Sequence, residues 1–75
     1  MNKIGEFKNE YGELFLILKD ENSFYLTGDE TDWEPLRLLP NFMEGPFPGT
    51  TIVYIDSFFV NDGELEKIKE IINNE

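Results

Sequence analysis

Short apolar runs separated by polar turns fill the first 28 residues of the chain. Within residues 13–19, positions 14–18 are all apolar, which favours a strand covered on both faces. Residues 9–12 and 20–23 have the polar and glycine residues of tight turns. Residues 3–8 precede the first turn, and the β-prone residues 24–27 follow the second. The pattern predicts a three-stranded antiparallel meander.

The middle of the chain is irregular, because all four prolines fall between residues 35 and 48. Pro35 and Pro40 bracket residues 36–39, which predict a short edge strand, since proline cannot donate to a sheet ladder. Residues 44–49, EGPFPG, predict a rigid and partly polyproline-like loop that holds Phe47 between two prolines.

The last third contains the longest β-branched and aromatic run and the clearest helix signal. Residues 50–60 predict a further strand that bends near Asp56 and Ser57. Asn61 can cap a helix over residues 62–73, and Glu64 can complete a capping box. Apolar residues then recur at helical spacing, as Leu65, Ile68, Ile71 and Ile72.

These elements predict an α+β fold with a small antiparallel sheet, made of the three-stranded meander plus one or two further strands. A C-terminal helix covers one face of this sheet. With 75 residues, the chain is expected to form one small acidic domain over residues 1–75. The expected core consists of Leu14, Leu16, Ile17, Phe24, Leu26, Ile52, Tyr54, Leu65, Ile68 and Ile72.

Charge changes this picture more than any other feature of the composition. Sixteen acidic residues against six basic ones give a net charge of −10. This charge disfavours direct binding to nucleic acid or to an anionic membrane, and it favours a protein partner with a basic surface. The simpler alternative is that acidity keeps a small domain in solution. No apolar run reaches the roughly 18 residues of a membrane span and no signal segment is recognisable, so we expect a cytoplasmic protein.

The chain offers little catalytic chemistry. It has no cysteine and no histidine, so disulfides, thiolate zinc sites and the commonest general base are excluded. A calcium loop starting at Asp29 would need glycine at its sixth position and glutamate at its twelfth, but these are Glu34 and Pro40. Asp56 lies in an apolar run, where it is expected to mark the strand bend rather than a catalytic acid. We expect no catalytic residue, no cofactor and no tight metal site. The alternative that remains is a weak surface site for a divalent ion.

An acidic cluster surrounds the single tryptophan, directly after the predicted meander. Aromatic anchors beside charged residues are typical of the energetic centres of protein interfaces. The alternative is that the rings close the open end of a small sheet. The candidate partner-binding residues are Asp29, Glu30, Asp32, Trp33 and Glu34, with Phe42 and Phe47 from the same proline-rich third.

Together these features predict a non-enzymatic acidic protein-binding module. The expected role is inhibition of a basic or nucleic-acid-acting protein, as by an immunity protein, an antitoxin or a phage-encoded blocker, because a basic groove steers an acidic partner to it. The alternative is a structural or regulatory subunit of a homo-oligomer, which would bury residues 36–39 or the helix stripe against another copy. An enzyme that relies on carboxylates alone is the third hypothesis.

Overall fold

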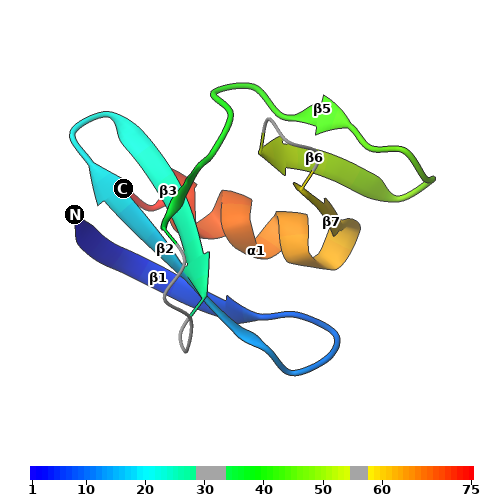
Figure 1. Ribbon diagram of the computed structural model, residues 1–75, viewed down its shortest axis with the longest axis horizontal. Coiled ribbons are helices and arrows are strands. Elements are labelled where there is room, and N and C mark those ends of the chain that lie inside the picture. Colours follow the sequence, from blue (N-terminus) through cyan, green and yellow to red (C-terminus); the bar gives the residue numbers. More distant parts are fainter. Residues whose placement is uncertain (29–33, 55–57) are drawn as a thin grey trace.

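The computed structural model describes residues 1–28, 34–54 and 58–75, and within them it has seven strands and one helix (Figure 1). The strands form two antiparallel sheets, and the helix follows the last strand. The predicted α+β class is therefore confirmed. The elements are β1 (Asn2–Lys8), β2 (Leu14–Asp20), β3 (Ser23–Gly28), β4 (Leu36–Arg37), β5 (Met43–Glu44), β6 (Thr50–Tyr54), β7 (Phe58–Asn61) and α1 (Asp62–Asn73).

Sheet A contains β1 to β4 in chain order, so the predicted meander and its short edge strand are confirmed. The first turn forms because the side-chain oxygen of Asn9 accepts hydrogen bonds from the backbone N–H groups of Tyr11 (3.0 Å) and Glu13 (2.9 Å). Gly12 closes this turn at φ +80°, in the left-handed region that favours glycine.

Sheet B contains β5, β6 and β7, and it corrects the expectation of one long strand over residues 50–60. This run forms two antiparallel strands, in which Thr50 lies opposite Asn61 and Ile52 opposite Phe59. The expected bend at Asp56 and Ser57 falls outside the described residues. The run has no glycine or proline to signal a break, so its sequence predicts one continuous strand.

Two backbone hydrogen bonds join the sheets. The N–H of Leu38 donates to the Phe24 carbonyl on β3 (2.8 Å), and the N–H of Leu39 donates to the Val53 carbonyl on β6 (2.9 Å). Consecutive residues after β4 therefore bond to sheet A and then to sheet B. Figure 1 shows α1 running between the two sheets.

The helix has the predicted bounds and the predicted capping box. The Asn61 side chain accepts from the Glu64 N–H (2.8 Å), and the Glu64 carboxylate accepts from the Asn61 N–H (2.9 Å). These bonds satisfy two backbone donors that have no partner within the helix. They fix where α1 begins and thereby which of its residues face the sheets.

The core lies where α1 meets both sheets. Its four fully buried large side chains come from four different elements, and they are Ile17 on β2, Leu26 on β3, Val53 on β6 and Ile68 on α1. Leu65 is also buried, so the predicted core positions Ile17, Leu26, Leu65 and Ile68 are confirmed.

The remaining expected core positions are only half-buried, and they are Leu14, Leu16, Phe24, Ile52, Tyr54 and Ile72. On β6 the expected facing was wrong, because Val53 points inward between Ile52 and Tyr54. Successive side chains of a strand alternate between its faces, so an error of one residue exchanges the faces. The sequence-based core also missed Phe7, Leu38, Val53 and Val60.

We predict that Ile68→Ala lowers the free energy of unfolding by about 2 to 5 kcal/mol, because it leaves a cavity in the core that both sheets share. Denaturant unfolding followed by circular dichroism measures this loss. Glu66→Ala, at an exposed position of the same helix, is the control and should change stability by less than about 0.5 kcal/mol. An unchanged midpoint for Ile68→Ala would contradict the packing of α1 described above.

Candidate functional site

The predicted partner-binding residues fall into three groups. Asp29, Glu30, Asp32 and Trp33 lie outside the described residues. Glu34 is exposed, and Phe47 is 61% exposed. Phe42 is half-buried and packs against the core. The two described aromatic candidates therefore lie in different surroundings, and only Phe47 presents its ring to solvent.

Phe47 projects from the turn between β5 and β6, and Thr50 holds this turn in shape. The Thr50 hydroxyl donates to the Phe47 carbonyl (2.6 Å) and accepts from the Phe47 N–H (3.2 Å). The Gly45 N–H donates to the Thr50 carbonyl (2.9 Å). A side chain at Gly45 would place its Cβ 2.7 Å from the Thr50 carbonyl carbon, so the turn requires glycine there. Phe47 is thus presented on a turn with a defined backbone.

The outer face of sheet B carries an exposed row of apolar side chains. Met43 and Phe59 both lie directly opposite Ile52, so these three residues share one face. The Phe47 ring meets the Phe59 ring edge to face, with 5.8 Å between ring centroids. Met43 is 58% exposed and Phe59 41%. We call Met43, Phe47, Ile52 and Phe59 the outer row.

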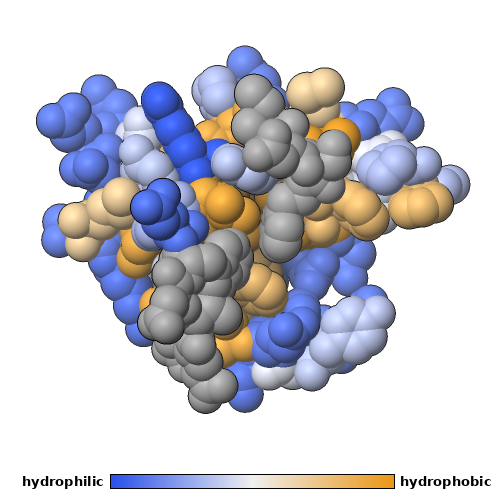
Figure 2. All heavy atoms as spheres, in the orientation of Figure 1, coloured by the Kyte–Doolittle hydropathy of each residue, from blue (hydrophilic) through white to orange (hydrophobic). Residues whose placement is uncertain are grey.

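The outer row is not part of the core. The other face of sheet B supplies the buried residues Val53 and Val60. A sheet with one solvated face normally places polar residues there. In Figure 2, apolar side chains reach the surface at the right-hand end of the molecule, over the β5–β6 turn. Contiguous exposed apolar surface of this kind marks interaction sites.

The segment of the sequence that contains the outer row has charged residues of one sign only. Residues 38–66, which contain sheet B and the start of α1, include no lysine or arginine. The acidic residues of this segment are Glu44, Asp56, Asp62, Glu64 and Glu66. Glu44 is the neighbour of Met43 on β5 and is exposed, so a partner that covers the outer row meets this carboxylate nearby.

A second apolar row, on sheet A, has different surroundings. Leu14, Leu16 and Leu18 share the face opposite to that of the buried Ile17, and each is half-buried. We call these three residues the leucine row. On β1 the basic residues Lys3 and Lys8 lie opposite Leu18 and Leu14. The acidic Glu6 lies between them, opposite Leu16, and forms an ion pair with Lys3 (3.1 Å). Arg37 lies on the same face, opposite Tyr25.

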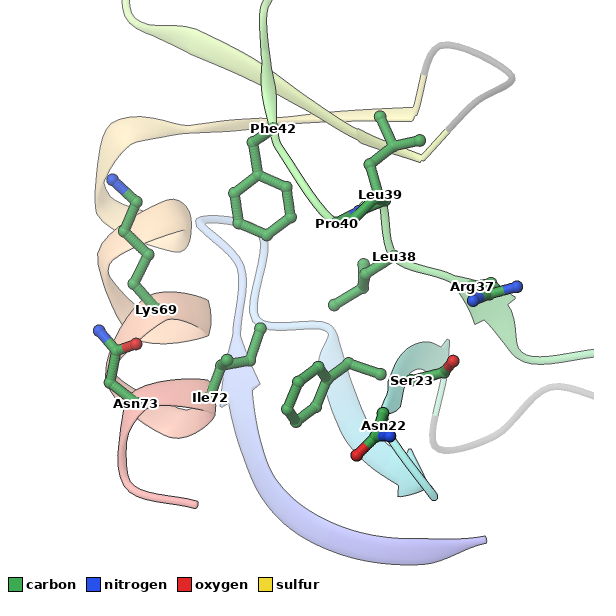
Figure 3. Close-up of a pocket in the computed structure, with 11 residues that line it drawn as sticks. Asn22, Ser23, Arg37, Leu38, Leu39, Pro40, Phe42, Lys69, Ile72 and Asn73 are labelled. Atoms are coloured by element: carbon green, nitrogen blue, oxygen red, sulfur yellow. The ribbon is translucent and has the colours of Figure 1, made fainter.

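Phe42 belongs to a groove between sheet A and the end of α1, with a volume of about 330 Å³. In Figure 3 the side chains of Phe42, Leu38 and Ile72 point into this groove. Arg37 and Lys69 also line it. Neither the outer row nor the leucine row contributes to it.

Tyr11 is an exposed aromatic residue away from sheet B, in the turn between β1 and β2. The hydrogen bond with Glu10 and the negative charge of Glu10 raise the pKa of its phenol, with smaller effects from Glu64 and Glu13. Tyr11 thus combines an aromatic ring with acidic neighbours, which makes it a matched comparison for Phe47.

The described residues contain no group of three or more histidine, cysteine or carboxylate side chains arranged to hold a metal ion. No helix in this part of the chain is long and apolar enough to cross a membrane.

Sequence reasoning missed three of the four residues of the outer row, namely Met43, Ile52 and Phe59. Ile52 was expected in the core, and Phe59 was expected in the same strand as Ile52. The apolar residues of β6 occupy both alternating positions, so the pattern alone does not tell which face is inside.

A scan against models of known protein families matched none of them, and searches of curated proteins and of solved structures found no similar protein.

We predict that alanine substitutions separate the two described aromatic candidates. Phe42→Ala should lower the free energy of unfolding by about 1 to 3 kcal/mol, because it removes a ring that packs against the core. Phe47→Ala should cost less than about 1 kcal/mol, because it removes an exposed ring with one edge contact. Thermal unfolding of both variants is the measurement. Equal losses would contradict the different surroundings of these rings.

Proposed function

We propose that this chain is a non-enzymatic protein-binding module that docks on a basic protein through the outer row. The observation that carries the proposal is the exposure of Met43, Phe47 and Phe59 on one face of sheet B, within a segment that has acidic but no basic residues. The leucine row is the less suitable surface for a basic partner, because the basic residues Lys3, Lys8 and Arg37 share its face with the acidic Glu6, which pairs with Lys3.

The two parts of this surface have different roles in binding. The aromatic pair Phe47 and Phe59 provides apolar area that is removed from water on contact, and aromatic residues dominate such interface centres. The fixed turn around Phe47 reduces the ordering cost of binding. Acidic residues such as Glu44 act earlier, because their field attracts a basic partner before contact.

We further propose that the partner acts on nucleic acid and that binding inhibits it. Proteins that act on nucleic acid maintain basic surfaces, and an acidic module that covers such a surface competes with the phosphate backbone. Immunity proteins, antitoxins and phage-encoded blockers are the classes that fit this role. The proposal places both proteins in the cytoplasm, since a chain without cysteine does not depend on an oxidising compartment for its stability.

A homo-oligomeric subunit is the second candidate function, and the leucine row favours it. The helix stripe is not free for this purpose, since Leu65 and Ile68 are buried within the chain, as is Leu38 after β4. Leu14, Leu16 and Leu18 would then pack against another copy. A molar mass in solution that rises with protein concentration, and that Leu16→Lys reduces, would favour this function.

We predict that the double variant Phe47→Ala/Phe59→Ala loses about 2 kcal/mol or more of binding free energy, mainly through faster dissociation. Basic proteins captured from a lysate of the native host supply the partner, and surface plasmon resonance with the purified partner gives the rates. Tyr11→Ala is the matched control and should bind as the unmodified chain does. Loss of binding in Tyr11→Ala alone would move the interface to the β1–β2 turn.

The charge part of the proposal has a separate test. Glu44→Lys should slow association and flatten its dependence on salt, because charges steer a partner over a Debye length of about 8 Å at physiological salt. Glu10→Lys changes the net charge equally but in the β1–β2 turn, and it should affect association less. Equal effects of the two reversals would show that net charge, and not the position of Glu44, attracts the partner.

The inhibitory role is tested last. If the purified partner is a nuclease or a nucleic-acid-binding protein, its activity should fall in proportion to the added module. The same amount of the double variant Phe47→Ala/Phe59→Ala should leave this activity unchanged. A partner that binds through the outer row but keeps its full activity would leave the module a binding protein and refute inhibition.

A further inference from the structure

We propose that the groove between sheet A and the end of α1 binds a small amphipathic carboxylate, which has an apolar body and one anionic end. The groove lies beside the β2–β3 turn, the segment that follows β4 and the last turns of α1. This site is separate from the outer row, so it does not depend on the function proposed above.

The floor of the groove is apolar and comes from three parts of the fold. Phe24 belongs to β3, Leu38 and Phe42 to the segment between β4 and β5, and Ile72 to α1. Figure 3 shows Leu38, Phe42 and Ile72 pointing toward one another across the groove. The volume of about 330 Å³ lies at the lower end of the range for small-molecule sites. It suits an aromatic ring or a short alkyl chain.

The rim of the groove selects for negative charge. Two of the six basic residues of the chain, Arg37 and Lys69, line the groove, whereas none of the acidic residues that the structure describes does. Figure 3 shows them at opposite sides of the mouth. Within the described part of the chain, neither forms an ion pair, so both cationic groups are free to bind an anion.

Neutral donors complete the rim. The amide side chains of Asn22 and Asn73 line the mouth, and no hydrogen bond engages either of them among the described residues. A carboxylate accepts hydrogen bonds from both cationic and amide donors, and charge-assisted bonds are the stronger ones. An ammonium group would meet a like charge at either side of the mouth.

The net charge of −10 does not prevent this binding. Exposed charges farther away than about 8 Å are largely screened at physiological salt. Among the described residues, Arg37 and Lys69 are the charged ones that line the groove itself, and we expect them to set the preference at the mouth.

Three probes with the same alkyl chain test the proposal, namely octanoate, 1-octanol and octylamine. Each is titrated into the full chain, and the backbone amide signals are followed by nuclear magnetic resonance. Octanoate should cause saturable shifts at the residues that line the groove, with a dissociation constant at least roughly threefold lower than that of either other probe.

Matched variants locate the anion. Lys69→Gln and Arg37→Gln should each raise the octanoate dissociation constant roughly threefold, as expected for the loss of one exposed charge contact. Lys67→Gln is the control, because Lys67 is an exposed lysine of the same helix that does not line the groove. The same spectra show whether each variant remains folded.

Several results would overturn the proposal. In the titrations, these results are no saturable shifts with octanoate, shifts confined to residues outside the groove, or binding of octylamine that is as tight as that of octanoate or tighter. Among the variants, the contradicting result is an equal effect of Lys67→Gln and Lys69→Gln on the octanoate dissociation constant. Equal binding of 1-octanol would retain an apolar site but refute its selectivity for a carboxylate. Failure here would leave the proposed protein interface untouched, since that interface uses other residues.

Discussion

The burial of Ile68 against both sheets is the contact on which the rest of this fold depends. The fully buried residues Ile17, Leu26 and Val53 come from two separate sheets, and Ile68 joins them through one helix. A chain of 75 residues buries a smaller share of its surface than a larger domain does, which leaves too little apolar area for an independent core in each sheet. One shared core, with the Leu38 and Leu39 hydrogen bonds beside it, holds sheet B in place.

This shared core separates the residues that stabilise the fold from those that are free to bind. The inner faces of both sheets are occupied by α1, so an apolar residue on an outer face contributes little to the core. Phe42 packs inward, whereas Phe47 is held outward by a turn that Thr50 stabilises. Lys3 and Lys8 lie beside the leucine row, whereas the segment that contains the outer row has no basic residue, and this difference is why we propose the outer row for a basic partner.

Local signals made much of this fold predictable. The Asn9 turn, the capping box of Asn61 and Glu64, and the helix bounds are encoded by neighbouring residues, and all three agree with the structure. Sheet B was not predicted, because residues 50–60 contain no glycine or proline, so Asp56 and Ser57 indicate a bend rather than a break, and β6 is apolar at both alternating positions. The exposed Phe47 could be named from its two flanking prolines, but its neighbours Met43 and Phe59 depend on strand pairing.

The most direct test asks whether a partner covers the outer row. The chain has no cysteine, so Met43→Cys and Tyr11→Cys each introduce a single thiol at an exposed site, one on the outer row and one on the β1–β2 turn. The measurement is the rate of thiol modification with and without the captured basic protein. If the outer row is the docking surface, the partner slows modification in Met43→Cys and leaves the rate in Tyr11→Cys unchanged. Protection of Tyr11→Cys with no protection of Met43→Cys would contradict it.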